Sequence, residues 1–99
     1  MSAKKTGQQT AVLASPPTIL CAGNVVGRME GEGPLAACFD YVDQDDTFGE
    51  ATWEQSERAM QQKALALALQ KGGLTAQQLD YLFAGDLLNQ CVSSSYAAR

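Results

Sequence analysis

Histidine is absent from this 99-residue sequence. Without an imidazole the chain holds neither a Ser-His-Asp nor a Cys-His pair, and it lacks a common nitrogen ligand for metals. The three cysteines, Cys21, Cys38 and Cys91, lie far apart, and none forms a Cys-x-x-Cys motif. Because an odd number cannot close a complete disulfide set, a reducing compartment is the simpler interpretation. We therefore predict no catalytic residue, no metal ligand and no cofactor site.

Basic residues are also scarce, with 7 Lys and Arg against 11 Asp and Glu and a net charge of −4. Nucleic acid is not an expected partner, since phosphate backbones are bound mainly by clustered Lys and Arg. No apolar run approaches the roughly 20 residues of a transmembrane helix. The residues before Cys21 imitate a lipoprotein signal, but Leu20 stands where a small residue is needed and prolines interrupt the run. We predict neither a signal peptide nor a membrane span, and a buried strand position for Cys21.

The hydrophobic fraction of 45% is enough for a packed core, and the length allows one small domain. Residues 1–8 are polar and are predicted to be flexible. Two short apolar runs, Thr10–Ala14 and Thr18–Ala22, predict strands on either side of a kink, because Pro16 and Pro17 prevent continuous pairing. The glycine-rich stretch over residues 23–33 predicts a loop.

A long helix is the clearest element of the sequence. Thr52 can cap its start, with Gln55 three residues on as the reciprocal partner of a capping box. The helical spacing of its apolar residues places four of them on one face: Trp53, Met60, Ala64 and Leu67. Leu65 and Leu69 widen this apolar surface, so we predict that protein covers the helix on two sides. The pair Gly72-Gly73 predicts a left-handed end.

The remaining residues predict an α/β arrangement. A helical turn at Thr75–Gln78 is followed by the apolar run Leu79–Ala84, which reads as a buried strand of a parallel sheet, and by a loop and helix over Leu87–Ala98. Three short strands and two real helices are too few to complete such a sheet. We therefore expect an incomplete sheet, in a chain that forms the front part of a larger domain.

Every charged residue from Glu30 to Glu57 is acidic, which is typical of a solvated surface loop. A calcium loop is the sharper alternative, because the residues at positions 1, 3, 5 and 12 of an EF-hand register are Asp43, Asp45, Thr47 and Glu54. Phe48, however, occupies the sixth position, where the sharp turn demands glycine. The solvated loop is the favoured interpretation.

Several segments together resemble a known family. Gly73-Leu74-Thr75 followed by Leu79-Asp80-Tyr81-Leu82 resembles the helix-to-strand join of the thiolase superfamily. The phrases Ala22-Gly23, Glu32-Gly33-Pro34-Leu35 and Ala84-Gly85-Asp86-Leu87-Leu88-Asn89-Gln90 resemble its non-catalytic branch, the stage V sporulation protein AD family. The resemblance implies a partial thiolase-like layered α/β fold, with residues 9–99 as the N-terminal part of the domain.

The same resemblance implies a function. Members of this branch handle dipicolinic acid, in its uptake into the developing spore and its release at germination, as binders rather than enzymes. The implied location is the forespore or spore, peripheral to the inner membrane, and the implied partners are dipicolinic acid, free or as its calcium chelate, and other stage V sporulation membrane proteins. The alternative is a fragment of a thiolase or ketoacyl synthase. In either case the superfamily's cysteine position would follow Arg99, so Cys91 is interpreted as structural.

Two residues are weak candidates for ligand binding. Asp86 and Asn89 come just after the predicted strand, and ligands of open α/β sheets gather at the carboxyl ends of strands. The favoured interpretation is that Asp86 caps the next helix and Asn89 orders the loop. A dianionic ligand such as dipicolinate would be repelled by Asp86 unless a cation, such as calcium, bridged the two.

Overall fold

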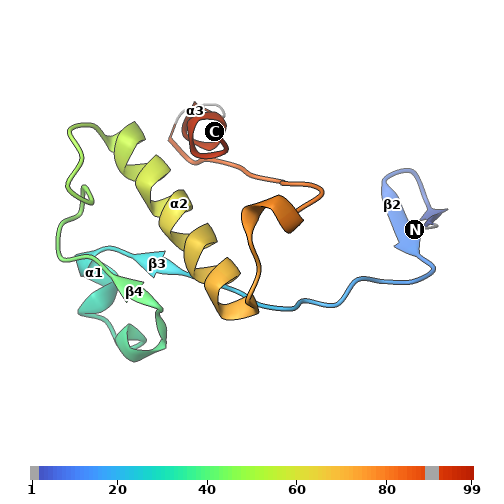
Figure 1. The fold of residues 1–99 in the computed structure, drawn as a ribbon, viewed down its shortest axis with the longest axis horizontal. Helices are drawn as coiled ribbons and strands as arrows, with labels where there is room; N and C mark the ends of the chain where they lie inside the picture. The colour runs from blue at the N-terminus through green and yellow to red at the C-terminus, as the bar shows by residue number, and fades with distance from the viewer. Residues whose placement is uncertain (1–2, 89–91) are drawn as a thin grey trace.

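The computed structural model describes residues 3–88 and 92–99 and begins with a hairpin. Strands β1 (Ala3–Thr6) and β2 (Thr10–Leu13) pair antiparallel, and an extended connection separates them from the other elements (Figure 1). The strand at residues 10–13 confirms part of the prediction. Residues 3–6, predicted to be flexible, form its partner instead, because Gly7 at φ 72° lets the chain turn back within a few residues.

The second pair of strands is parallel and joins β3 (Val25–Val26) to β4 (Tyr41–Val42). Helix α1 (Arg28–Gly31) and the 3-10 turn η1 (Ala36–Cys38) lie between them. The prediction of a strand at residues 18–22 is wrong, since this extended stretch has no strand partner among the described residues. The prediction of a loop over residues 23–33 is wrong in part, because this stretch contains β3 and α1.

Helix α2 (Trp53–Gly72) confirms Thr52 as the N-cap and the left-handed end, whereas the reciprocal Gln55 half of the predicted capping box is not among the hydrogen bonds of the described residues. The Thr52 hydroxyl oxygen accepts a hydrogen bond from the Gln55 N–H at 3.1 Å, and Gly73 adopts the left-handed conformation at φ 66°. The short helical turn predicted at Thr75–Gln78 is confirmed as the 3-10 turn η2 (Ala76–Gln78), and a capping box formed by Thr75 and Gln78 precedes it. Helix α3 (Val92–Ala97) closes the described chain and packs against α2.

The segment that leads into β3 lies directly on α2. An ideal Cβ placed on Gly23 would stand 2.7 Å from the Ala64 carbonyl oxygen and 2.7 Å from the Ala68 nitrogen. Glycine is therefore required here by close backbone approach. Cys21, predicted in a buried strand, is partly buried outside any strand, and its Sγ lies 2.7 Å from the Cβ position of Gly72.

A polar cluster joins β3, β4 and α2. The Asn24 N–H donates to Asp40 Oδ2 at 2.9 Å, and the Asp40 N–H donates to Asn24 Oδ1 at 2.7 Å. Lys71, in the last turn of α2, forms a salt bridge with Asp40. The hydrogen bond from Lys71, together with that from the Asn24 backbone, lowers the pKa of Asp40. The cluster ties both strands of the parallel pair to the end of the helix.

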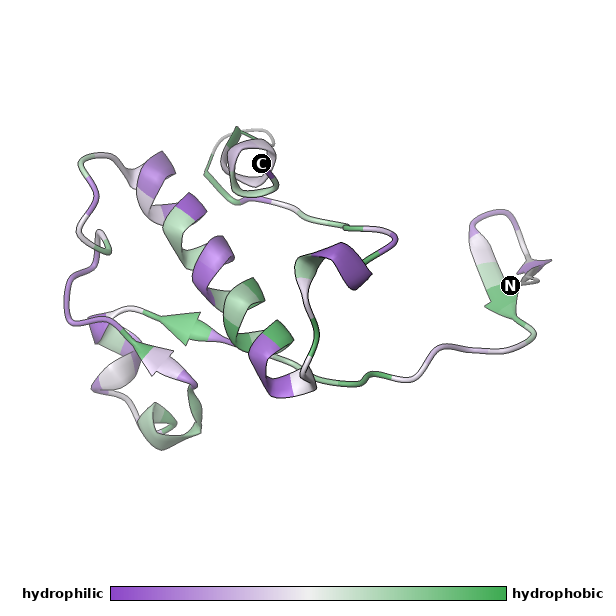
Figure 2. Ribbon diagram, in the orientation of Figure 1, coloured by the Kyte–Doolittle hydropathy of each residue, from purple (hydrophilic) through white to green (hydrophobic). Residues whose placement is uncertain are grey.

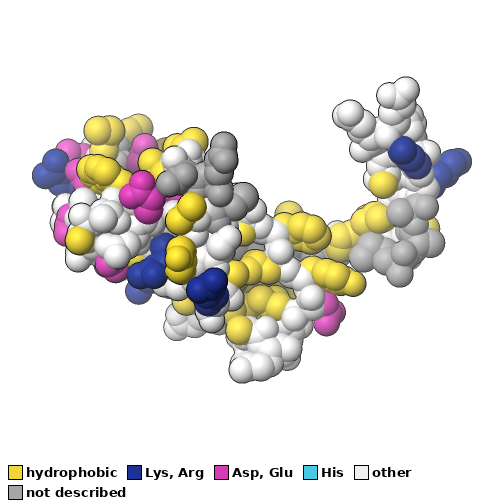
Figure 3. All heavy atoms as spheres, turned by 90° about the horizontal axis from the view of Figure 1, so that it is seen from above, with side chains coloured by type: hydrophobic (Ala, Val, Ile, Leu, Met, Phe, Trp, Pro, Cys, Tyr) yellow, Lys and Arg dark blue, Asp and Glu magenta, His cyan; other side chains and the backbone are white. Residues whose placement is uncertain are grey.

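The described residues bury no hydrophobic side chain; only Ser56, Ser93 and Ser94 are buried. Apolar stretches alternate with polar ones along the ribbon, and hydrophobic side chains lie open on the face seen in Figure 3 (Figures 2 and 3). The accessible surface is 7750 Å², against about 5,400 Å² for a compact chain of 10.5 kDa. The radius of gyration is 16.2 Å, where about 13 Å is usual for this length.

The predicted buried strand at residues 79–84 is wrong for the described chain. These residues are extended but unpaired, with Tyr81 82% and Phe83 92% exposed. No described strand lies beside them, so they form no strand pairing within residues 3–88 and 92–99. Helix α2 contacts β3 and α3, yet Trp53 on its predicted covered face remains 58% exposed. The structure thus confirms an α/β chain with short, incomplete sheets.

Candidate functional site

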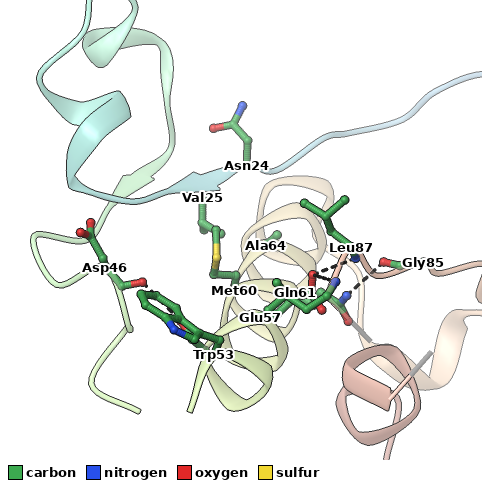
Figure 4. Close-up of a pocket in the computed structure, with 12 residues that line it drawn as sticks. Asn24, Val25, Asp46, Trp53, Glu57, Met60, Gln61, Ala64, Gly85 and Leu87 are labelled. Carbon is green, nitrogen blue, oxygen red and sulfur yellow. Dashed lines mark hydrogen bonds between the residues drawn. The ribbon is translucent and has the colours of Figure 1, made fainter. Parts of the chain in front are cut away.

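Three parts of the chain line an open cavity of about 640 Å³ (Figure 4). Asn24 and Val25 form one wall, the face of α2 forms the floor, and the segment from Gly85 to Leu88 forms the opposite wall. The floor is contributed by Trp53, Ser56, Glu57, Met60, Gln61 and Ala64, and Asp46 lies at the end near the indole ring. The cavity therefore depends on α2 to hold both walls.

Two polar side chains of α2 hold the second wall. Glu57 Oε2 accepts hydrogen bonds from the backbone N–H groups of Leu87 at 2.9 Å and Leu88 at 3.3 Å. The Gln61 side-chain amide donates to the Gly85 carbonyl oxygen at 3.1 Å. Residues four apart share one helix face, so the pair acts on a single segment. Neither residue was predicted from the sequence, although two polar positions beside the apolar Trp53, Met60 and Ala64 of this face were a visible signal.

Asp86, a predicted ligand-binding candidate, lies at the start of α3. Its Oδ2 accepts from the backbone N–H groups of Ser93 at 2.8 Å and Ser94 at 3.3 Å, and its Oδ1 accepts from the Ser94 hydroxyl at 2.6 Å. These hydrogen bonds satisfy N–H groups that a helix leaves unpaired in its first turn. This geometry is the one expected if Asp86 caps α3. The other candidate, Asn89, lies outside the described residues, as does Cys91.

The cavity is acidic. Asp46 and Glu57 line it, while no Lys or Arg is among its lining residues. Glu57 Oε1 is buried and finds no hydrogen-bond partner among residues 3–88 and 92–99, and the contact from Arg28 to Asp46 is long, at 3.8 Å. A free anionic ligand would be repelled here. A neutral or cationic ligand suits these walls better.

The alternative calcium loop has not formed in the structure. Asp45 accepts hydrogen bonds from Thr47 and from the Gly49 N–H, and these bonds lower the pKa of Asp45, with the Thr47 N–H as the largest cause. Glu54 lies within α2 instead of closing a loop. Among residues 3–88 and 92–99, no group of three or more metal-ligating side chains comes together. Phe48 takes φ 53°, a conformation that favours glycine.

Comparison with known proteins identifies the family. The model of the family "Stage V sporulation protein AD (SpoVAD)" matches residues 7–99. The chain belongs to this family. It is also similar to the stage V sporulation protein AD of Bacillus subtilis (strain 168), with 42% identity over 96 residues. That alignment covers 97% of this chain and 28% of the relative's length.

The family match includes every residue that lines the cavity and both α2 side chains that hold its second wall. The family takes its name from sporulation and not from an enzymatic reaction. Within the part of the chain that the structure describes, no helix is long and apolar enough to cross a membrane.

Proposed function

We propose that this chain is part of a non-enzymatic sporulation protein with a thiolase-like layered fold that binds dipicolinic acid. The observation that carries the proposal is the family match over residues 7–99, together with 42% identity to a stage V sporulation protein AD. Since the chain spans 28% of that relative's length, the activity belongs to the longer protein. The expected roles are uptake of dipicolinic acid into the developing spore and its release at germination.

The chemistry of the cavity favours the calcium chelate over the free acid. Dipicolinate carries two negative charges, which Asp46 and Glu57 would repel. Its calcium chelate is neutral, so the same carboxylates no longer oppose binding. The indole of Trp53, 58% exposed, offers a flat surface on which a pyridine ring can stack. Asp86, with both carboxylate oxygens on α3, shapes the wall instead of meeting the ligand.

We place the protein in the forespore or spore, on the surface of the inner membrane, beside other stage V sporulation membrane proteins. The sporulation role of the family supports this proposed location. A test is to follow a fluorescent fusion during sporulation and to recover the membrane-bound fraction. A fusion that stays in the mother cell would contradict the proposed location.

Calorimetry of a chimera tests the binding itself. In the chimera this chain replaces the matching segment of the Bacillus subtilis relative, so that a whole protein is measured. We expect saturable binding of dipicolinate that is tighter with Ca²⁺ present, and no binding of benzene-1,3-dicarboxylate, which lacks the ring nitrogen. Absence of dipicolinate binding under both conditions would refute the proposed function. Equal affinity with and without Ca²⁺ would refute the chelate as the bound form.

Variants of the chimera locate the site. Trp53→Ala should weaken binding of the chelate about tenfold or more, because a stacked aromatic ring contributes on the order of 1 kcal/mol beyond its buried area. Asp86→Asn should leave the affinity unchanged, since the amide oxygen can still accept a hydrogen bond from α3. A loss of affinity in Asp86→Asn with α3 intact would instead return Asp86 to the ligand site.

A further inference from the structure

A second cavity, of about 240 Å³, lies where α3 packs against the first turns of α2. The residues that line it are Glu54, Gln55 and Arg58 of α2 with Val92 and Tyr96 of α3. None of these five lines the larger, acidic cavity. Ligand pockets usually measure about 300 Å³ or more, so this smaller cavity suits a single small group better than a whole aromatic ligand.

Arg58 brings a positively charged hydrogen-bond donor into this cavity. Its Nε atom is buried and finds no hydrogen-bond partner among residues 3–88 and 92–99. Within the same residues no salt bridge joins its guanidinium to a carboxylate, although Glu54 lies one helical turn before it. Buried donors in proteins are nearly always hydrogen-bonded. The guanidinium is therefore expected to meet an acceptor from outside the described chain.

A second cation and partly exposed apolar side chains lie beside Arg58. The guanidinium carbon of Arg99 stands 5.1 Å from the centre of the Tyr96 ring. Tyr96 is 51% exposed and Val92 is 37% exposed, so apolar surface borders the charged groups. A guanidinium presents its N–H groups in a fork that matches phosphate oxygens. Arginine and tyrosine are also suited to a membrane surface, because each joins an apolar body to a polar tip.

We propose that Arg58, with Arg99 beside it, binds the phosphate group of an anionic membrane lipid in the cavity between α2 and α3. The inference rests on the proposed placement of the protein at a membrane surface and does not depend on dipicolinate binding. Free phosphate presents the same oxygen atoms and is the other source of the group. Glu54 opposes the anion, because its carboxylate lines the same cavity.

Vesicle sedimentation of the chimera described above tests the site. Vesicles of phosphatidylcholine with and without phosphatidylglycerol are compared, and calorimetry with inorganic phosphate tests the free anion. We expect the chimera to sediment only with the vesicles that contain phosphatidylglycerol. Binding of inorganic phosphate that Arg58→Gln abolishes, without vesicle binding, would support the site with free phosphate as its ligand. Binding of neither would overturn the site, even if the fluorescent fusion is found at the membrane.

Matched variants separate the site from general electrostatic attraction. Arg58→Gln should weaken vesicle binding about fivefold or more, the effect of one basic residue at an anionic surface. Arg28→Gln removes the same charge from α1, which lies apart from α3 (Figure 1), and should weaken binding less than about twofold. Equal effects of the two variants would contradict the site.

A third variant separates the site from a loss of structure. Glu54→Gln should tighten vesicle binding, because it removes the carboxylate that opposes the anion. A variant that misfolds would not bind more tightly, so a gain can only come from the cavity itself. Unchanged or weaker binding by Glu54→Gln would contradict the proposal.

Discussion

Replacement of Gly23 by alanine tests how the strand segment is held on α2. The added Cβ would stand 2.7 Å from two backbone atoms, the Ala64 carbonyl oxygen and the Ala68 nitrogen. Backbone atoms of a helix cannot rotate away as a flexible side chain can, so the segment must lift off α2. Overpacking of this kind costs about 1–3 kcal/mol. The opening equilibrium of the segment should therefore rise by about 5-fold to 150-fold.

The thiol of Cys21 reports this opening, because it is partly buried against the end of α2 near Gly72. In a background carrying Cys38→Ser and Cys91→Ser, we expect a thiol reagent to modify Cys21 faster in Gly23→Ala than in the parent. Gly85→Ala is the matched control, since a Cβ at Gly85 meets no atom within 4 Å. Equal rates of Cys21 modification in Gly23→Ala, Gly85→Ala and the parent would refute the close packing of this segment on α2.

Three further predictions concern the caps and the polar cluster. Thr52→Ala should speed amide exchange in the first turn of α2 about fivefold, because an N-cap contributes about 1 kcal/mol; unchanged exchange would contradict this. In NMR titrations the pKa of Asp40 should lie below its ordinary value and return towards it in Lys71→Gln. Because the folded-state pKa of Asp40 is lowered, the stabilisation by its carboxylate is fully present above about pH 4 and is lost as the pH falls through that lowered value. Identical Asp40 titration curves in the parent and in Lys71→Gln would contradict the contact. Asp86→Ala should speed hydrogen exchange of the Ser93 and Ser94 amides, whereas Asp86→Asn should protect these amides in part. Equal exchange rates in the two variants would argue against capping by Asp86.

Local signals in the sequence predicted the elements that need only neighbouring residues. Helix α2 is capped by Thr52 and by Gly73 as predicted, because both caps act within a single turn. The turn at Thr75 was predicted for the same reason. The hairpin of β1 and β2 was not, since two lysines made residues 1–8 look like a solvated tail, whereas the left-handed turn at Gly7 decides the pairing.

Elements that depend on distant partners were harder to predict. The apolar run at residues 79–84 has the composition of a buried strand, but burial needs neighbours that the described chain does not supply. In the site, a cap was the favoured interpretation of Asp86 because such caps act over a few residues, and its hydrogen bonds to Ser93 and Ser94 agree with it. Glu57 and Gln61 escaped notice because their backbone partners lie 24 to 31 residues further along the chain.

Differential scanning calorimetry of the isolated chain tests the central claim most directly, namely that its apolar side chains find no interior within this chain. No described hydrophobic residue is buried, so we predict a scan without a cooperative endotherm. A compact domain of this length would instead unfold with an enthalpy of about 60–80 kcal/mol. A single sharp transition of that size, from a monomer, would contradict the account.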